Sequence, residues 1–138
     1  MFEQIDGAIR GGDIVRGFLS GAGLRVIRIE DSSGQLKGYG EHPHAPEALA
    51  FANQDVGAGG SNYEDVYGKT LPHYLTGSSM PTSALDQLIL NGGKFRARAE
   101  GDDVVLEACD YNYNPEGTFS AATFDAALRL LEASSGNK

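Results

Sequence analysis

Apolar and polar residues follow one pattern in two regions of the chain and predict a repeated helix-strand-strand unit. Residues 83–110 begin with apolar positions at helical spacing and continue with two stretches in which apolar and polar residues alternate. Residues 13–40 follow the same pattern without a gap, at an offset of 70 residues. Arg28 and Arg98 occupy one equivalent position of this alignment. We therefore predict an internal duplication.

The first unit is predicted to begin with a helix over residues 13–20, with Phe18 on its apolar face. Residues 24–30 alternate between apolar and charged side chains, which is typical of a strand. Residues 31–34, Asp-Ser-Ser-Gly, have the composition of a hairpin turn. Residues 35–40 are then the returning strand.

A helix is expected after each hairpin. Residues 47–53 are rich in alanine and predict a short helix, whereas residues 120–134 predict a longer one. Residues 111–118 precede the longer helix and contain many turn-forming residues, so we expect a loop there. Residues 56–81 have no counterpart in the other unit, and an insert of this length is expected to contain some ordered helix.

These elements predict an α+β fold in a single domain over residues 1–138. The units of about 13–55 and 83–134 would flank the asymmetric insert 56–81. We expect a two-layer α/β sandwich of duplicated helix-β-hairpin-helix units, with a mainly antiparallel four-stranded sheet and helices mainly on one face. The pattern leaves open whether the two hairpins join into one sheet. The predicted core includes Phe18, Leu88, Ile89 and Leu128.

Composition agrees with a globular cytoplasmic protein. The 138 residues are 41% hydrophobic and 22% charged, which argues against disorder. The formal net charge of −8 argues against a surface that attracts nucleic acid or anionic lipid everywhere, but it allows a local basic patch. The single cysteine, Cys109, cannot form an intramolecular disulfide. No stretch approaches the roughly 18 apolar residues of a membrane span, so no membrane partner is expected.

One face of the predicted sheet carries a concentration of basic side chains. If Ile27, Ile29 and Phe95 face the helices, alternation directs their neighbours to the other side. The candidate partner-binding residues are Arg28, Lys37, Tyr39, Lys94, Arg96 and Arg98. This face could bind another protein or a second copy of the chain. It could instead bind nucleic acid through phosphate contacts and stacking on Tyr39, or simply be a solvated outer face.

Metal-binding and catalytic patterns are weak. Glu41, His42 and His44 offer three possible metal ligands, but no second cluster completes a coordination shell unless the insert brings His73 to them. The glycine-rich residues 57–61 lack the spacing of a phosphate-binding loop. We therefore predict no metal and no cofactor.

No residue pattern indicates a catalytic centre. Nothing near Cys109 in the sequence indicates a lowered pKa. The nucleophile elbow of serine hydrolases is absent, and adjacent acidic residues on strands or turns point apart. The favoured function is thus a non-enzymatic, cytosolic protein-interaction domain. The alternatives are a nucleic-acid-binding module that uses the basic face, and an acidic inhibitor that imitates nucleic acid. An enzyme acting through Cys109 or the histidines ranks last.

Overall fold

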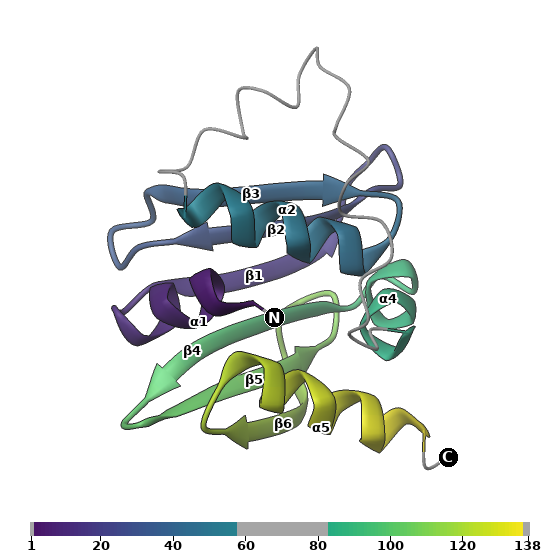
Figure 1. Cartoon of the computed structure of the whole chain (residues 1–138). Coiled ribbons are helices and arrows are strands. Elements are labelled where there is room, and N and C mark those ends of the chain that lie inside the picture. Colours follow the sequence, from purple (N-terminus) through teal and green to yellow (C-terminus); the bar gives the residue numbers. More distant parts are fainter. Residues whose placement is uncertain (1, 58–82, 137–138) are drawn as a thin grey trace.

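The computed structural model describes residues 2–57 and 83–136, and the two described segments contain the same succession of elements (Figure 1). The first comprises α1 (Glu3–Arg10), β1 (Ile14–Leu19), β2 (Arg25–Glu30), β3 (Leu36–His42) and α2 (Ala45–Gly57). The second comprises α4 (Ser83–Leu90), β4 (Lys94–Glu100), β5 (Asp103–Cys109), β6 (Pro115–Ala121) and α5 (Phe124–Gly136). Each half is therefore an α-β-β-β-α unit.

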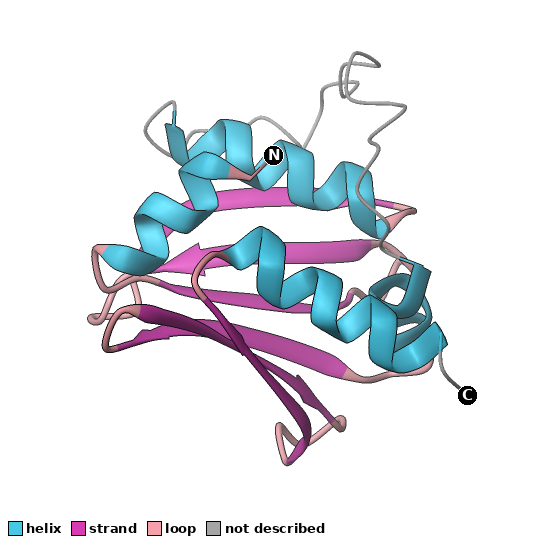
Figure 2. Ribbon diagram, turned by 60° about the horizontal axis from the view of Figure 1, so that its bottom comes forward, coloured by secondary structure: helices cyan, strands magenta, loops and turns pink. Residues whose placement is uncertain are grey.

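The strands of both halves form one antiparallel sheet, in the order β3-β2-β1-β4-β5-β6. The helices lie in a layer on one side of it (Figure 2). This confirms an α+β fold with an antiparallel sheet, but the prediction of four strands was wrong because the described residues form six. The halves join where β1 pairs with β4, and Arg16 lies opposite Arg96 at this junction.

The hydrophobic core lies between the helices and the sheet. Ile27, Ile29 and Phe95 face the helices and are fully buried, as the alternation predicted. Ile89 and Leu128 are also fully buried, which confirms their predicted place in the core. Leu88 is half-buried and packs against the core. Phe18 is half-buried and lies outside this cluster, so its assignment to the core was wrong.

The helix predicted for residues 13–20 is instead strand β1. Val15 and Gly17 are buried on the helix side of the sheet, while Arg16 and Phe18 alternate with them. Glycine in an apolar position hid this alternation, and the remaining apolar residues also fit helical spacing. The alignment at an offset of 70 residues therefore matched strand β1 of the first half with helix α4 of the second half.

Equivalent residues of the two halves are 79 or 80 positions apart, as for Tyr39 and Thr118 or Arg16 and Arg96, which replaces the predicted offset of 70. Gly12 and Gly92 have φ angles of 106° and 90° and end α1 and α4 with the same turn. The N–H of Gly12 donates to the carbonyl of Ile9 at 3.0 Å, and the N–H of Gly92 donates to that of Ile89 at 3.0 Å. A left-handed residue after a helix favours glycine, so these two glycines fix the true alignment.

Residues 111–118 were predicted to form a loop. This prediction was wrong for the residues after Asn114, because β6 begins at Pro115. Asp110 Oδ1 accepts hydrogen bonds from the backbone N–H groups of Asn112 at 2.8 Å and Asn114 at 2.9 Å. Asp31 makes the same pair of bonds in the hairpin of the first half. This Asx turn is tight enough to return the chain directly into a third strand.

Both second helices differ from their predicted limits. α5 begins at Phe124, four residues later than predicted, and α2 extends to Gly57. Most of the predicted insert 56–81 lies outside the described residues, as does His73. Among the residues that the structure describes, no helix is long and apolar enough to cross a membrane.

The two halves exchange helix caps. Asp6 of α1 accepts a hydrogen bond from the N–H of Phe124, the first residue of α5, at 3.0 Å. Asp86 of α4 accepts one from the N–H of Ala45, the first residue of α2, at 2.8 Å. Because each carboxylate satisfies a free N–H group at the start of a helix in the other half, the caps hold the halves together.

Candidate interaction surface

One face of the six-stranded sheet lies opposite the helix layer (Figure 2), and the strand pairings bring a row of residues into register across it. The strand pairings place these residues in register in the order Tyr39, Arg28, Arg16, Arg96, Glu107 and Thr118. Three arginines are therefore consecutive at the middle of the sheet. Arg16 and Arg96 are equivalent residues of the two halves, so the approximate two-fold axis passes between them.

Two carboxylates hold the arginines in place. Glu30 contacts Arg16 at 3.0 Å and Arg28 at 3.2 Å. Glu107 contacts Arg96 at 3.1 Å and Arg98 at 2.7 Å, and is only 8% exposed. Shared carboxylates orient the guanidinium groups and cancel part of their charge. The surface is therefore a mixed array of charges with a basic surplus around its centre.

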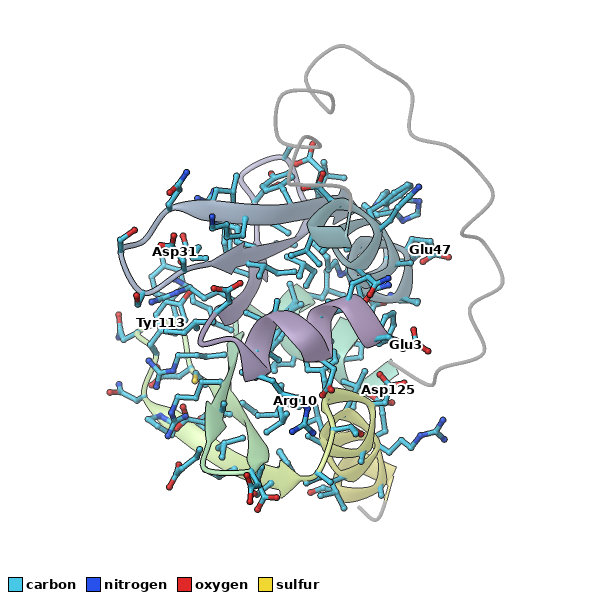
Figure 3. All side chains as sticks on the ribbon, turned by 60° about the vertical axis from the view of Figure 1, so that its left-hand side comes forward. Glu3, Arg10, Asp31, Glu47, Tyr113 and Asp125 are labelled. Carbon is cyan, nitrogen blue, oxygen red and sulfur yellow. The ribbon has the colours of Figure 1, made fainter. Side chains whose placement is uncertain are left out.

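Tyr113 lies among these cations with an unusual backbone conformation. Its φ angle is 64°, and the equivalent residue of the first hairpin is Gly34, with φ 86°. The ring centroid lies 5.7 Å from Cζ of Arg16 and 5.9 Å from Cζ of Arg96. Figure 3 shows Tyr113 on the other side of the molecule from the helical residue Asp125. The strained residue thus places an aromatic ring beside the central arginines.

Lys94 connects this ring to a second tyrosine. Its Nζ lies 4.7 Å from the ring centroid of Tyr113 and 4.7 Å from that of Tyr111. Both distances allow cation–π attraction. Tyr111 is 71% exposed, whereas Tyr113 and Lys94 are half-buried, so the ring of Tyr111 offers most of the accessible surface of this group. We call Arg16, Lys94, Arg96, Tyr111 and Tyr113 the tyrosine–arginine cluster.

The structure places the remaining predicted residues differently. Lys37 lies near the edge of the sheet, with Nζ 4.0 Å from Asp31. Tyr39 is only 4% exposed, and its hydroxyl donates to Glu41 at 3.0 Å. Its backbone N–H donates to Asp55 at 2.8 Å. A buried ring offers little surface to a nucleic-acid base, which removes the stacking contact expected of Tyr39.

Sequence reasoning missed three members of the cluster. Arg16 was overlooked because its segment was assigned to a helix, and Tyr111 and Tyr113 were assigned to a loop without a partner. The detectable signal was the Asp-x-x-x hairpin turn shared by residues 31–34 and 110–113. When these two turns are aligned, Tyr113 occupies the position of Gly34, where the turn favours glycine.

The possible metal ligands do not converge. Glu41 accepts a hydrogen bond from Tyr39, while His42 Nδ1 accepts one from the N–H of His44 at 3.1 Å. His42 also lies 3.9 Å from Glu47. Within residues 2–57 and 83–136, no group of three histidine, cysteine or acidic residues is arranged to hold a metal ion.

Cys109 is fully buried on β5. Burial raises the pKa of the Cys109 thiol, because it disfavours the charged thiolate. Its Sγ lies 3.8 Å from the carbonyl oxygen of Glu107. A buried protonated thiol is a poor nucleophile, so this environment favours a packing role.

No protein-family model, curated protein or solved structure matches the chain. The functional argument therefore rests on the surface itself.

Proposed function

We propose that the chain is a non-enzymatic, cytosolic protein-binding domain, and that the tyrosine–arginine cluster is its binding surface. Tyr113 is the observation that carries this proposal. A left-handed backbone costs a residue with a side chain about 1–2 kcal/mol, and the equivalent turn avoids this cost with Gly34. Tyr113 is half-buried, and backbone strain that persists at such a residue is typical of functional positions.

The chemistry of the cluster suits a protein partner. Tyrosine and arginine are enriched among the residues that contribute most to protein–protein binding. The ion pairs with Glu30 and Glu107 fix Arg16 and Arg96 before binding, which reduces the conformational entropy lost on association. The surplus of cations favours a partner surface with carboxylates, on another protein or on a second copy of this chain.

A nucleic-acid ligand is the alternative, favoured by Lys94 between two tyrosine rings. Against it, Glu30 and Glu107 would repel phosphates from the middle of the row, and the net charge of −8 would oppose a polyanion elsewhere. The third possibility, an acidic inhibitor that imitates nucleic acid, rests on the net charge alone.

Replacing Tyr113 by glycine is expected to abolish partner binding while changing the free energy of unfolding by less than about 1 kcal/mol. The lost cation–π contacts, each about 0.5–1 kcal/mol at exposed sites, are offset by the relieved backbone strain. Urea denaturation measures stability. Titration calorimetry measures binding to the partner that co-purifies from the native host.

Leu130→Ala is the matched control, because Leu130 is a large exposed side chain on α5, away from the cluster. This variant should bind as the wild type does. Unchanged binding by Tyr113→Gly would contradict the proposed surface.

Charge reversal at Lys94 is expected to separate the two ligand classes. Reversal of both Arg96 and Arg98 would place two more carboxylates beside the nearly buried Glu107, so it would disturb the fold. The side chain of Lys94 lies against aromatic rings instead. Lys94→Glu should therefore fold normally and bind the protein partner at least about tenfold more weakly.

The control for charge is Arg129→Glu, an equal change at an exposed position of α5. It should leave binding unchanged. Fluorescence anisotropy of the wild type with single-stranded and duplex DNA or RNA tests the alternative. Micromolar binding that falls steeply with salt, and is lost in Lys94→Glu, would favour nucleic acid over a protein partner.

A further inference from the structure

The two edges of the sheet are protected unequally. At the β3 edge, α2 lies directly on the strand, since a Cβ built on Gly40 would be 2.2 Å from the carbonyl oxygen of Ala48 and 2.6 Å from the backbone nitrogen of Ala52. Asp55 of α2 is 2% exposed and accepts the N–H of Tyr39 at 2.8 Å. The outward N–H of Tyr39 is thus satisfied within the chain.

The β6 edge lacks both of these features. Phe119 occupies the position equivalent to Gly40, and a side chain there prevents a helix from lying as close as α2 lies to β3. Ser134 occupies the position of Asp55. Exposed and half-buried residues alternate along β6. Across the described part of the chain, no hydrogen bond from a side chain reaches the outer edge of β6.

A groove lies beside this edge. It has a volume of about 350 Å³ and is lined by Leu88 and Gln87 of α4, Leu131 of α5, and Gly117 and Phe119 of β6. The missing close contact between α5 and β6 explains why the space exists. Leu88, Leu131 and Phe119 contribute apolar surface that suits a hydrophobic side chain, and polar residues such as Gln87 complete the lining.

The groove continues into a second hollow of about 450 Å³ that ends at Tyr111. Leu88, Asn91 and Glu116 line both hollows. The charged residues among the described lining residues are Glu116 and Asp110, both acidic. Hydrogen bonds from Asn114 lower the pKa of Asp110, so this carboxylate stays ionised at neutral pH.

We propose that the β6 edge binds an extended segment of a partner protein as an additional strand, with an apolar side chain in the groove and a lysine or arginine beside Glu116 and Asp110. Main-chain hydrogen bonds would supply affinity, and the groove and the two carboxylates would supply specificity. An unprotected edge strand is otherwise a site of aggregation, which natural proteins avoid. This surface shares only Tyr111 with the tyrosine–arginine cluster and goes beyond the proposed function.

The register identifies the backbone groups that would pair. Thr118 lies opposite Glu107 as Tyr39 lies opposite Arg28, and the N–H of Tyr39 points away from the sheet to Asp55. The N–H of Thr118 is therefore the central outward donor of β6. Proline is tolerated in an edge strand where the N–H faces outward, so Thr118→Pro removes this donor with limited damage to the fold.

The test uses the full chain and a synthetic peptide of alternating valine and lysine, about as long as β6. Titration calorimetry measures affinity, and amide hydrogen exchange by NMR measures protection of β6. The wild type should bind the peptide and protect the amide of Thr118. Thr118→Pro should weaken binding at least tenfold, whereas Thr118→Val, which keeps the N–H, should bind normally.

Two further binding measurements test the proposal without relying on the folding of Thr118→Pro. Glu116→Lys should weaken binding of the valine–lysine peptide and strengthen binding of its valine–glutamate counterpart. A peptide with N-methyl groups on alternate residues should lose affinity, because it cannot complete the strand pairing. The absence of binding, or binding that leaves the Thr118 amide unprotected, would overturn the proposal. Concentration-dependent protection of Thr118 without peptide would assign the edge to a second copy instead.

Discussion

Replacing Asp86 by alanine is expected to lower the free energy of unfolding by about 3 kcal/mol. Asp86 caps α2 through the N–H of Ala45 and contacts Arg25 Nε at 2.9 Å. The side chain of Arg25 is only 9% exposed, so loss of the carboxylate leaves a cation without its counter-charge in a nearly dry site. Loss of the helix cap accounts for about 1 kcal/mol of this total. Urea or thermal denaturation measures the effect.

Asp6→Ala is the matched control, because Asp6 is the equivalent residue of the first half. It caps α5 through Phe124 and contacts Arg10 at 2.9 Å, but the side chain of Arg10 is 44% exposed. Water solvates Arg10 in the variant, so the expected loss is about 1 kcal/mol, mostly from the cap. Equal losses in the two variants would show that the burial of Arg25 has no energetic consequence.

Replacing Gly40 by alanine is expected to cost about 3 kcal/mol, by forcing α2 away from β3. The added Cβ would lie 2.2 Å from a backbone oxygen of α2, which cannot move without a shift of the helix. That shift would also weaken the hydrogen bond between Asp55 and the N–H of Tyr39. Denaturation measures the cost, and amide exchange at Tyr39 reports whether the edge opens.

Gly117→Ala is the comparison on the other edge strand. A Cβ at Gly117 would meet only the ring of Phe119, at 3.3 Å, and the ring lies beside the groove into which it can move. We expect a change below about 1 kcal/mol. A Gly40→Ala variant as stable as Gly117→Ala would contradict the close packing of α2 on β3.

The sequence predicted strand β2, whose alternation is complete, but missed β1 and β6, which are interrupted by glycine or proline. β2 combines Ile27 and Ile29 with charged neighbours, and its faces were assigned correctly. β1 was missed because Gly17 occupies an inward position, where the ring of Phe95 fills the space that a side chain would take. β6 was missed because Pro115 and Gly117 resemble loop residues. The amino acids of one segment do not reveal which side chains a neighbouring strand places against it.

The candidate surface was predicted in outline only. Alternation identified the face of Arg28, Arg96 and Arg98, because each lies on a strand of clear period two. The pairing of both Arg96 and Arg98 with Glu107 could not be foreseen, since it depends on the register of β4 with β5. The role of Tyr113 depends on its backbone angle at the turn, which the sequence indicates only when the two hairpin turns are aligned and Tyr113 falls on Gly34.

The exchanged caps make each half of the chain depend on the other. Asp6 completes a helix of the second half, and Asp86 completes one of the first. A polypeptide consisting of one half would leave both its carboxylate and the start of its second helix without these partners, and would expose the edge of β1 that pairs with β4. Neither half is therefore expected to be stable as a separate fragment.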